Sequence, residues 1–112
     1  MDTIVAIATP QGRSAIGVVR LTGPDSLSIL RRLVGDLEFQ PQPSQVTLKR
    51  LLSRGSRDVI DYALVIYFAA PNSYTGENMV EISCHGGILI SAKVLEACLR
   101  AGARAARPGE FT

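Results

Sequence analysis

The sequence predicts an α+β fold, a mixed β-sheet with two helices on one face. Three observations support this class. Short apolar runs occur near the N-terminus, and segments with the two-residue period of a β-strand occur through the middle of the chain. Two segments, beginning near residues 25 and 88, carry apolar residues at helical spacing instead. The resulting order is strand, strand, helix, three strands, helix, strand, so strands come in runs and do not alternate strictly with helices.

Length and composition suit one small domain over residues 1–112, since 46% of the residues are hydrophobic and 20% are charged. This hydrophobic content excludes disorder, and a net charge of +2 gives little attraction to nucleic acid. No apolar run reaches the ~20 residues that span a bilayer, and residues 1–8 lack the pattern of a signal peptide. We therefore expect a cytoplasmic protein, with Cys84 and Cys98 as free thiols.

The first two predicted strands are Thr3–Ala8 and Ala15–Leu21, separated by a loop containing Pro10 and Gly12. The second strand is almost continuously apolar, which predicts a strand covered on both faces. Arg20 interrupts it.

A helix is predicted after the turn Thr22–Asp25, because proline and an acidic residue both favour the first helical turn. Leu27, Leu30 and Val34 follow at helical spacing, and Gly35 is a typical C-terminal stop.

A loop with two prolines, residues 36–45, leads into a predicted β-hairpin. Val46, Leu48 and Leu52 alternate with polar residues and indicate a half-buried strand. After a turn over residues 54–57, a longer strand carries apolar residues along one face: Ile60, Tyr62, Leu64, Ile66 and Phe68.

In the next strand, Val80, Ile82 and Cys84 should face the core, and the residues between them, Glu81, Ser83 and His85, a more polar side. Two glycines then open the second helix. Its expected apolar stripe is Ile88, Ala92, Leu95 and Leu99, with an ion pair between Glu96 and Arg100 on the opposite face. Gly102 ends this helix, and residues 103–106 form a last strand.

Reactive side chains concentrate in residues 72–87, NSYTGENMVEISCHGG. A thiol beside an imidazole suggests a nucleophile and its base, but adjacent residues of a strand point to opposite faces. We therefore expect Cys84 in the core, with no side-chain bond to His85. A metal site needs three or four ligands, which one histidine and two distant cysteines do not supply.

The stretch His85–Gly87 has two interpretations. Glycines at a helix start let an anionic ligand approach the first backbone N–H groups. Alternatively, His85 is a polar cap of the helix. The sequence has no GxxxxGK[ST] motif, so this chain alone should not bind or hydrolyse a nucleoside triphosphate.

Glu81 is unusual because an acidic residue in the middle of a strand is disfavoured. It is a solvated edge residue, a partner for an arginine, or a ligand contact. If the two strands are neighbours, Glu81 and Arg20 could pair across the sheet. A pterin would also suit this region, since one carboxylate accepts its adjacent N–H and amino donors, its ring stacks on Tyr74, and its glutamate tail attracts arginine.

Three stretches resemble the N-terminal domain of the tRNA modification GTPases of the MnmE (TrmE) family: DTIVAIATPQGRSAIGVVRLTGPDS, PNSYTGENMVEISCHGG and GARAARPGEFT. They follow the family's order and span the chain from end to end. The departures are small. Gln11 stands where proline is common in the family, Thr22 where serine is common and Asn78 where aspartate is common.

The resemblance implies a fold similar to the folate-binding domains of aminomethyltransferases, and a domain that forms a homodimer. It implies binding of a tetrahydrofolate derivative, 5-formyl- or 5,10-methylene-tetrahydrofolate. With the flavoprotein MnmG, the family adds an aminomethyl or carboxymethylaminomethyl group to C5 of the tRNA wobble uridine. GTP, magnesium and potassium would belong to a G domain outside these residues, so we expect an N-terminal fragment of a longer GTPase that also has a helical domain.

The resemblance assigns pterin or tail contacts to Arg20, Tyr74, Glu77 and Glu81, and no catalytic residue. Pro108–Thr112 would lead into the next domain. Two alternatives stay open: a module that only dimerises, and a free-standing aminomethyltransferase-like enzyme. The lack of a second half and of a convincing acid–base set argues against the second.

Overall fold

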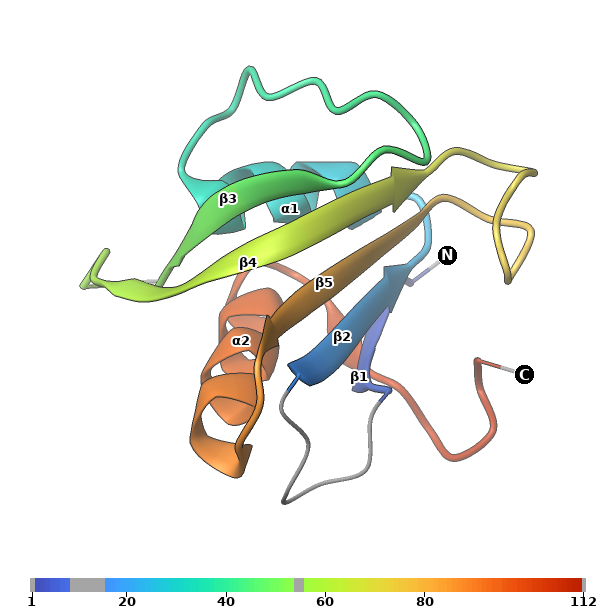
Figure 1. The fold of residues 1–112 in the computed structure, drawn as a ribbon. Helices are drawn as coiled ribbons and strands as arrows, with labels where there is room; N and C mark the ends of the chain where they lie inside the picture. Colours follow the sequence, from blue (N-terminus) through green and yellow to red (C-terminus); the bar gives the residue numbers. More distant parts are fainter. Residues whose placement is uncertain (1, 9–15, 54–55, 112) are drawn as a thin grey trace.

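The computed structural model describes residues 2–8, 16–53 and 56–111. The predicted loop at Pro10 and Gly12 lies outside these residues, as do residues 54–55 of the predicted turn. The order of elements is the predicted one (Figure 1): β1 Ile4–Ile7, β2 Ile16–Thr22, α1 Ser26–Val34, β3 Thr47–Leu52, β4 Val59–Phe68, β5 Met79–His85, α2 Ile88–Arg100 and β6 Arg104–Ala105.

The strands of the described residues form one six-stranded sheet in the order β3-β4-β5-β2-β1-β6. β6 runs parallel to β1, and the other neighbours are antiparallel, so the predicted mixed sheet is confirmed. The predicted hairpin is β3 and β4. Both helices lie behind the sheet in Figure 1, which confirms the α+β class and leaves the other face of the sheet open.

The core lies between the helices and the sheet. Val80, Ile82 and Cys84 of β5 are buried there, as strand alternation predicts, together with Leu21 of β2 and Leu30 of α1. A single cluster of apolar side chains thus joins the sheet to the helices. The burial of such side chains is the main favourable term in folding.

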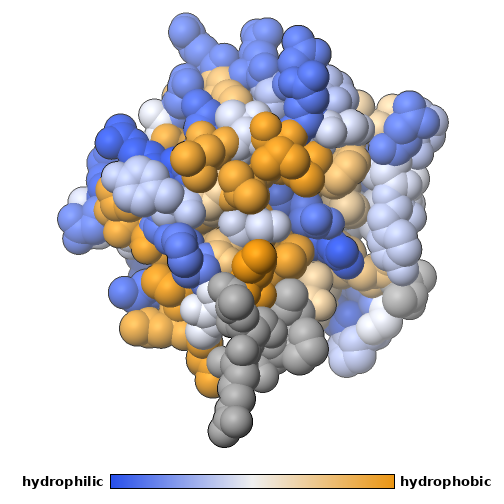
Figure 2. Space-filling view, in the orientation of Figure 1, coloured by the Kyte–Doolittle hydropathy of each residue, from blue (hydrophilic) through white to orange (hydrophobic). Residues whose placement is uncertain are grey.

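The open face of the sheet corrects two expectations. β2 is not covered on both faces, because Ile16 is 57% exposed there. In β3, Leu48 is 65% exposed, and the buried residues are Leu51 and Leu52. Both differences have one cause, since the two helices cover the same side of the sheet. Figure 2 shows hydrophobic side chains gathered on the open face.

The apolar stripe predicted for α2 is wrong. Ile88 and Leu99 are exposed, and the residues that α2 buries are Ser91, Val94, Ala97 and Cys98. The helix presents small side chains to the sheet and therefore approaches it closely. A Cβ atom added at Gly17 of β2 would lie 2.5 Å from Ser91 Oγ. The close approach that small side chains allow, and not the hydrophobicity of the large ones, decides which face of α2 is buried.

The predicted helix ends and surface pair are correct. Gly35 closes α1 in the left-handed conformation (φ 71°), which glycine adopts at little cost. The Glu96 carboxylate lies 3.1 Å from Arg100 Nε on the exposed side of α2. Such a pair contributes only ~0.3 kcal/mol. No helix in the described part of the chain is long and apolar enough to cross a membrane.

Candidate functional site

Cys84 and His85 point to opposite faces of the sheet, as predicted. The Cys84 thiol donates to the carbonyl oxygen of Gly17 (3.4 Å), and burial raises its pKa. His85 Nδ1 lies 2.7 Å from Asp61 Oδ1, and the His85 backbone N–H donates to Asp61 Oδ2. The alternative of His85 as a helix cap is wrong, because Gly87 occupies the N-cap of α2 without a side-chain bond.

The Asp61 side chain that binds His85 is an ionised carboxylate. Burial raises the pKa of Asp61, but the backbone and side-chain hydrogen bonds from His85 lower it more, so the net pKa lies below the ordinary value. Among residues 2–8, 16–53 and 56–111, no three His, Cys, Asp or Glu side chains come together as a possible metal site.

Arg20 and Glu81 form an ion pair on the open face. They are directly opposite each other in the β2–β5 register, and Arg20 Nε lies 3.0 Å from Glu81 Oε2. Both side chains keep part of their surface in contact with solvent. Of the interpretations of Glu81 that the sequence left open, the cross-strand partner of Arg20 is observed, and the pair leaves a guanidinium edge and a carboxylate oxygen available to a ligand.

The loop between β4 and β5 places Tyr74 beside this pair. Thr75 Oγ1 lies 2.7 Å from Thr22 Oγ1 of β2, which fixes the loop to the sheet. Ser73 Oγ donates to the carbonyl oxygen of Glu77 (2.5 Å) and closes the loop on itself. The Tyr74 ring centroid consequently lies 6.0 Å from the Arg20 guanidinium carbon, at the outer limit of a cation–π contact.

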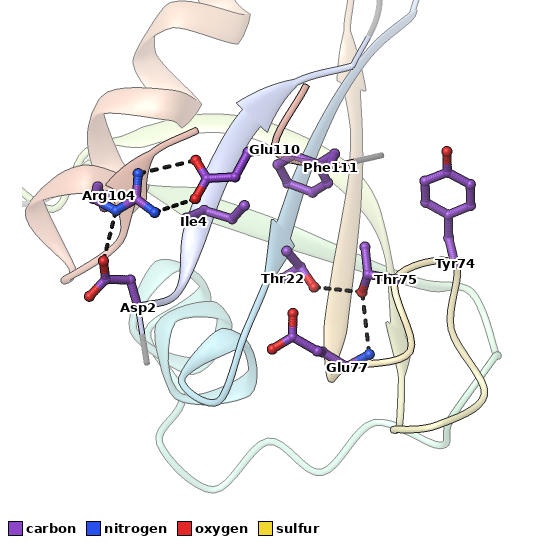
Figure 3. A pocket seen from close by; sticks show the side chains of 9 residues that line it. All are labelled: Asp2, Ile4, Thr22, Tyr74, Thr75, Glu77, Arg104, Glu110 and Phe111. Atoms are coloured by element: carbon purple, nitrogen blue, oxygen red, sulfur yellow. Dashed lines mark hydrogen bonds and ion pairs between the residues drawn. The ribbon is translucent and has the colours of Figure 1, made fainter. Parts of the chain in front are cut away.

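Glu77 faces a cavity of about 470 Å³ at the end of this loop (Figure 3). Thr22, Thr75 and Tyr74 line the same cavity. Glu77 is half-buried, and within the described residues its carboxylate has no hydrogen-bond or ion-pair partner. An unpartnered, partly buried carboxylate is costly in isolation and favours a ligand that offers hydrogen-bond donors.

Arg20 lines a second cavity, of about 160 Å³, together with Ala6 and Ala8 of the β1 strand and its end. Phe111 lines both cavities and is the residue that the two linings share. Of the four residues singled out from sequence, Tyr74 and Glu77 line the larger cavity from the β4–β5 loop, and Arg20 lines the smaller one. Glu81 lines neither cavity and is joined to the site by its ion pair with Arg20.

Sequence reasoning missed the opposite wall of the larger cavity. Asp2, Arg104, Glu110 and Phe111 all line it, and they come from the two ends of the chain (Figure 3). The motif PGEFT contained the signal, but it was interpreted as a connection to another domain. Only the fold brings it back beside β1.

Ion pairs between Arg104 and two acids hold this wall together. The hydrogen bond to Glu110 and that to Asp2 raise the pKa of Arg104, and the Arg104 guanidinium lowers the pKa of Glu110 to about 2. Two of the three acids in this wall and floor are therefore neutralised by one arginine. Glu77 is the third of these acids. Arg104 does not bind it, so its carboxylate is the one of the three that can accept hydrogen bonds from a ligand.

The arrangement suits binding more than catalysis. In the described residues, two aromatic rings, two guanidinium groups and three carboxylates line the two cavities. This set fits a flat ligand with paired N–H donors and an anionic tail. The nucleophile candidate Cys84 lies on the other side of the sheet.

Comparison with known proteins gives one consistent result. The family model described as "GTP-binding protein TrmE N-terminus" matches residues 3–112. The chain is 46% identical to the tRNA modification GTPase MnmE of Helicobacter pylori (strain HPAG1) over 99% of the chain and 23% of that protein. The chain is 47% identical to MnmE of Thermotoga petrophila, in a match that covers 100% of the chain and 24% of that protein. The chain thus spans about a quarter of the length of the relatives it matches.

Proposed function

Because the chain belongs to the family of the GTP-binding protein TrmE N-terminus, we propose that it is the tetrahydrofolate-binding and homodimerisation domain of a tRNA modification GTPase. In this proposal the whole protein works in the cytoplasm with the flavoprotein MnmG. Together they add an aminomethyl or carboxymethylaminomethyl group to C5 of the tRNA wobble uridine. GTP, magnesium and potassium act in a different domain.

The observation that carries the folate proposal is the Arg20–Glu81 pair with Tyr74 beside it. A pterin presents a ring N–H and an amino group side by side, and a carboxylate accepts both. Glu77 offers a carboxylate without a partner in the described residues, and Glu81 offers the oxygen that Arg20 Nε does not bind. Arg20 attracts the anionic tail, and Tyr74 stacks on the ring.

The ligand would supply a one-carbon unit, in the form of 5-formyl- or 5,10-methylene-tetrahydrofolate. The residues of this chain bind and orient it. The partly buried carboxylates fit the donor pattern of the pterin, and the exposed ring of Tyr74 gains a partner when the ligand covers it.

Calorimetric titration with 5-formyltetrahydrofolate tests this site. We expect saturable binding that weakens about 10-fold or more in Arg20→Ala and in Glu81→Gln, since each loses a charge-assisted contact. Arg100→Ala and Glu96→Gln are matched controls, because this exposed ion pair lies on α2, away from the open face. They should bind as the wild type does.

Other outcomes identify the alternatives. A well-folded dimer that does not bind 5-formyltetrahydrofolate would favour a module that only dimerises. Turnover of the folate by this chain alone would favour a free-standing aminomethyltransferase-like enzyme. Loss of binding in Glu77→Gln, but not in Glu81→Gln, would place the pterin contact at Glu77.

The open face of the sheet supports the dimer part of the proposal. Exposed apolar side chains from three strands gather there: Ile16, Leu48, Tyr62 and Leu64. These side chains line a depression of about 250 Å³. On this face Arg20 is paired with Glu81, the Asp61 carboxylate binds His85, and Arg50 of β3 is exposed opposite Tyr62. The apolar part of this surface is compatible with a second copy of itself across a two-fold axis.

A further inference from the structure

Residues 107–111 fold back beside the sheet and reach the candidate site. The Arg107 N–H donates to Glu110 Oε1 (2.6 Å), and the Glu110 N–H donates to the carbonyl oxygen of Arg107 (3.0 Å). The turn is therefore closed twice, by a side chain and by the backbone. Gly109 has a positive φ of 78° within it, which lets the chain reverse. The direction of Phe111, the next residue after this turn, is set by these bonds.

Arg104 ties the turn to the sheet. Its Nη1 donates to Glu110 Oε1 (3.1 Å) and its Nη2 to Glu110 Oε2, while its Nε donates to Asp2 Oδ2 (2.9 Å). A planar guanidinium that binds a carboxylate through two nitrogens fixes orientation as well as distance. Arg104 itself is anchored in β6, opposite Ile4 of β1. One side chain thus joins the N-terminal segment, the sheet and the turn.

Phe111 stands at the junction of the two cavities. It shares the larger one with Tyr74 and Glu77, and the smaller one with Arg20. In Figure 3, Phe111 lies between the Arg104–Glu110 pair and Tyr74. Two aromatic side chains from segments far apart in the sequence therefore border one cavity, with a carboxylate at its floor. This combination suits a flat, hydrogen-bonding ring.

We propose that Phe111 is the second aromatic wall of the ring site, across from Tyr74, and that Arg104 is the positioning residue that holds it there. This inference rests on the proposed folate site and identifies a second side chain that contacts the pterin ring. Phe111 supplies contact area to the flat pyrimidine part of a pterin, and the Arg104–Glu110 pair keeps that area in place before the ligand binds. A preformed wall loses less conformational freedom on binding than a loose segment does.

The positioning role of Arg104 can be tested without a ligand. The sequence contains no tryptophan, so Phe111→Trp in the full chain places a fluorescent reporter at the wall. We expect Arg104→Gln in this background to move the indole emission to longer wavelength, because the released ring enters water. Arg100→Gln, which removes an exposed arginine from α2, should leave the emission unchanged. Circular dichroism confirms that each variant is folded. Unchanged emission in folded Arg104→Gln would overturn the positioning role.

The wall is tested by binding of 5-formyltetrahydrofolate. Phe111→Ala should weaken binding about 10-fold, as loss of one stacking side chain does elsewhere, and Phe111→Leu should weaken it less. Phe111→Tyr keeps the ring and should bind within about 3-fold of wild type. Arg104→Gln should weaken binding in the same direction as Phe111→Ala, with no further loss when the two are combined.

The outcomes separate this inference from the proposed function. If the wild type binds the folate and Phe111→Ala binds it equally well, the role of Phe111 as a wall of the site is overturned. The proposed folate site then stands. If the wild type does not bind, the folate site fails, and the wall with it. Equal losses in Phe111→Ala and Phe111→Tyr would overturn the stacking role, since the ring is retained in the second variant.

Discussion

Cys84 and Cys98 are both buried, and burial controls their chemistry. It raises the pKa of the Cys84 thiol and raises the pKa of Cys98 to about 12. The thiolate is the reactive form, so neither side chain should react at neutral pH in the folded protein. We expect no alkylation by iodoacetamide at pH 7.5, and rapid alkylation of both cysteines in denaturant, as measured by mass spectrometry. Alkylation of Cys84 in the native protein within minutes would contradict this burial.

The Glu110 carboxylate makes the position of the Phe111 wall dependent on pH. Its pKa is lowered to about 2 from an ordinary value of 4.5, so the folded state favours the ionised form. The stabilisation is complete above pH 4.5 and is lost as the pH falls from there to about 2. In Phe111→Trp, the indole emission should stay constant from pH 7 to 4.5 and move to longer wavelength below that range.

Glu110→Gln provides the control for this titration, because it has no carboxylate to protonate. Combined with Phe111→Trp, it should show the long-wavelength emission already at pH 7. A shift of the Phe111→Trp emission between pH 7 and 5 would show that a different group holds the wall.

Single residues were predictable where they broke a local pattern. Arg20 and Glu81 each interrupt an apolar strand, and this shared irregularity raised their pairing as one interpretation, which the structure confirms. Phe111 breaks no pattern of this kind. Its position depends on the Arg104–Glu110 pair, and Arg104 in turn binds Asp2, which is 102 residues away. No local rule reports such a contact.

At the scale of elements, β2 and α2 meet at Gly17. A Cβ atom there would lie 2.5 Å from Ser91 Oγ, so Gly17→Ala should force the Ser91 hydroxyl to rotate or the helix to move away from the sheet. We expect a loss of about 1–3 kcal/mol in the free energy of unfolding, as is typical of overpacked cores. Urea denaturation followed by circular dichroism measures it.

Ser91→Ala is the matched partner, because it removes the oxygen that the new methyl group would meet. The double variant should lose less stability than the sum of the two single losses. Strict additivity would contradict the close approach of α2 to β2 at this point.

The same contact explains why the elements were predicted but one helix face was not. Apolar runs and periodicity together predicted the type and order of the elements, because strand and helix spacings differ over a few residues. For α2, the large residues Ile88 and Leu99 were assigned to the core. The structure instead buries Ser91 and Ala97, since small side chains allow the helix to pack closely on the sheet.

For the molecule as a whole, the apolar content of β2 predicted cover on both faces of the sheet. The helices supply cover on one face only, and Ile16 and Leu48 stay exposed on the other. Sequence patterns report that a face is apolar, but they do not tell whether the same chain or another one covers it. The proposed dimer accounts for the second face.

Leu64→Glu provides the test of that dimer. Leu64 is 47% exposed on the open face, beside Leu48 and Tyr62 in the same depression. A carboxylate there would be buried without a partner in a two-fold interface, twice per dimer. We expect dimer formation to weaken by at least about 2 kcal/mol, or about 30-fold in Kd, as measured by sedimentation velocity over a range of concentrations.

Leu37→Glu is the control, because Leu37 is 72% exposed in the loop between α1 and β3, near Gly35 and Arg57 and away from the open face. It makes the same chemical change and should leave the dimer intact. A wild-type chain that sediments as a monomer at high concentration would contradict the dimer directly. Equal dimerisation of folded Leu64→Glu and wild type would show that the dimer uses a different surface, and the apolar open face would then need another partner.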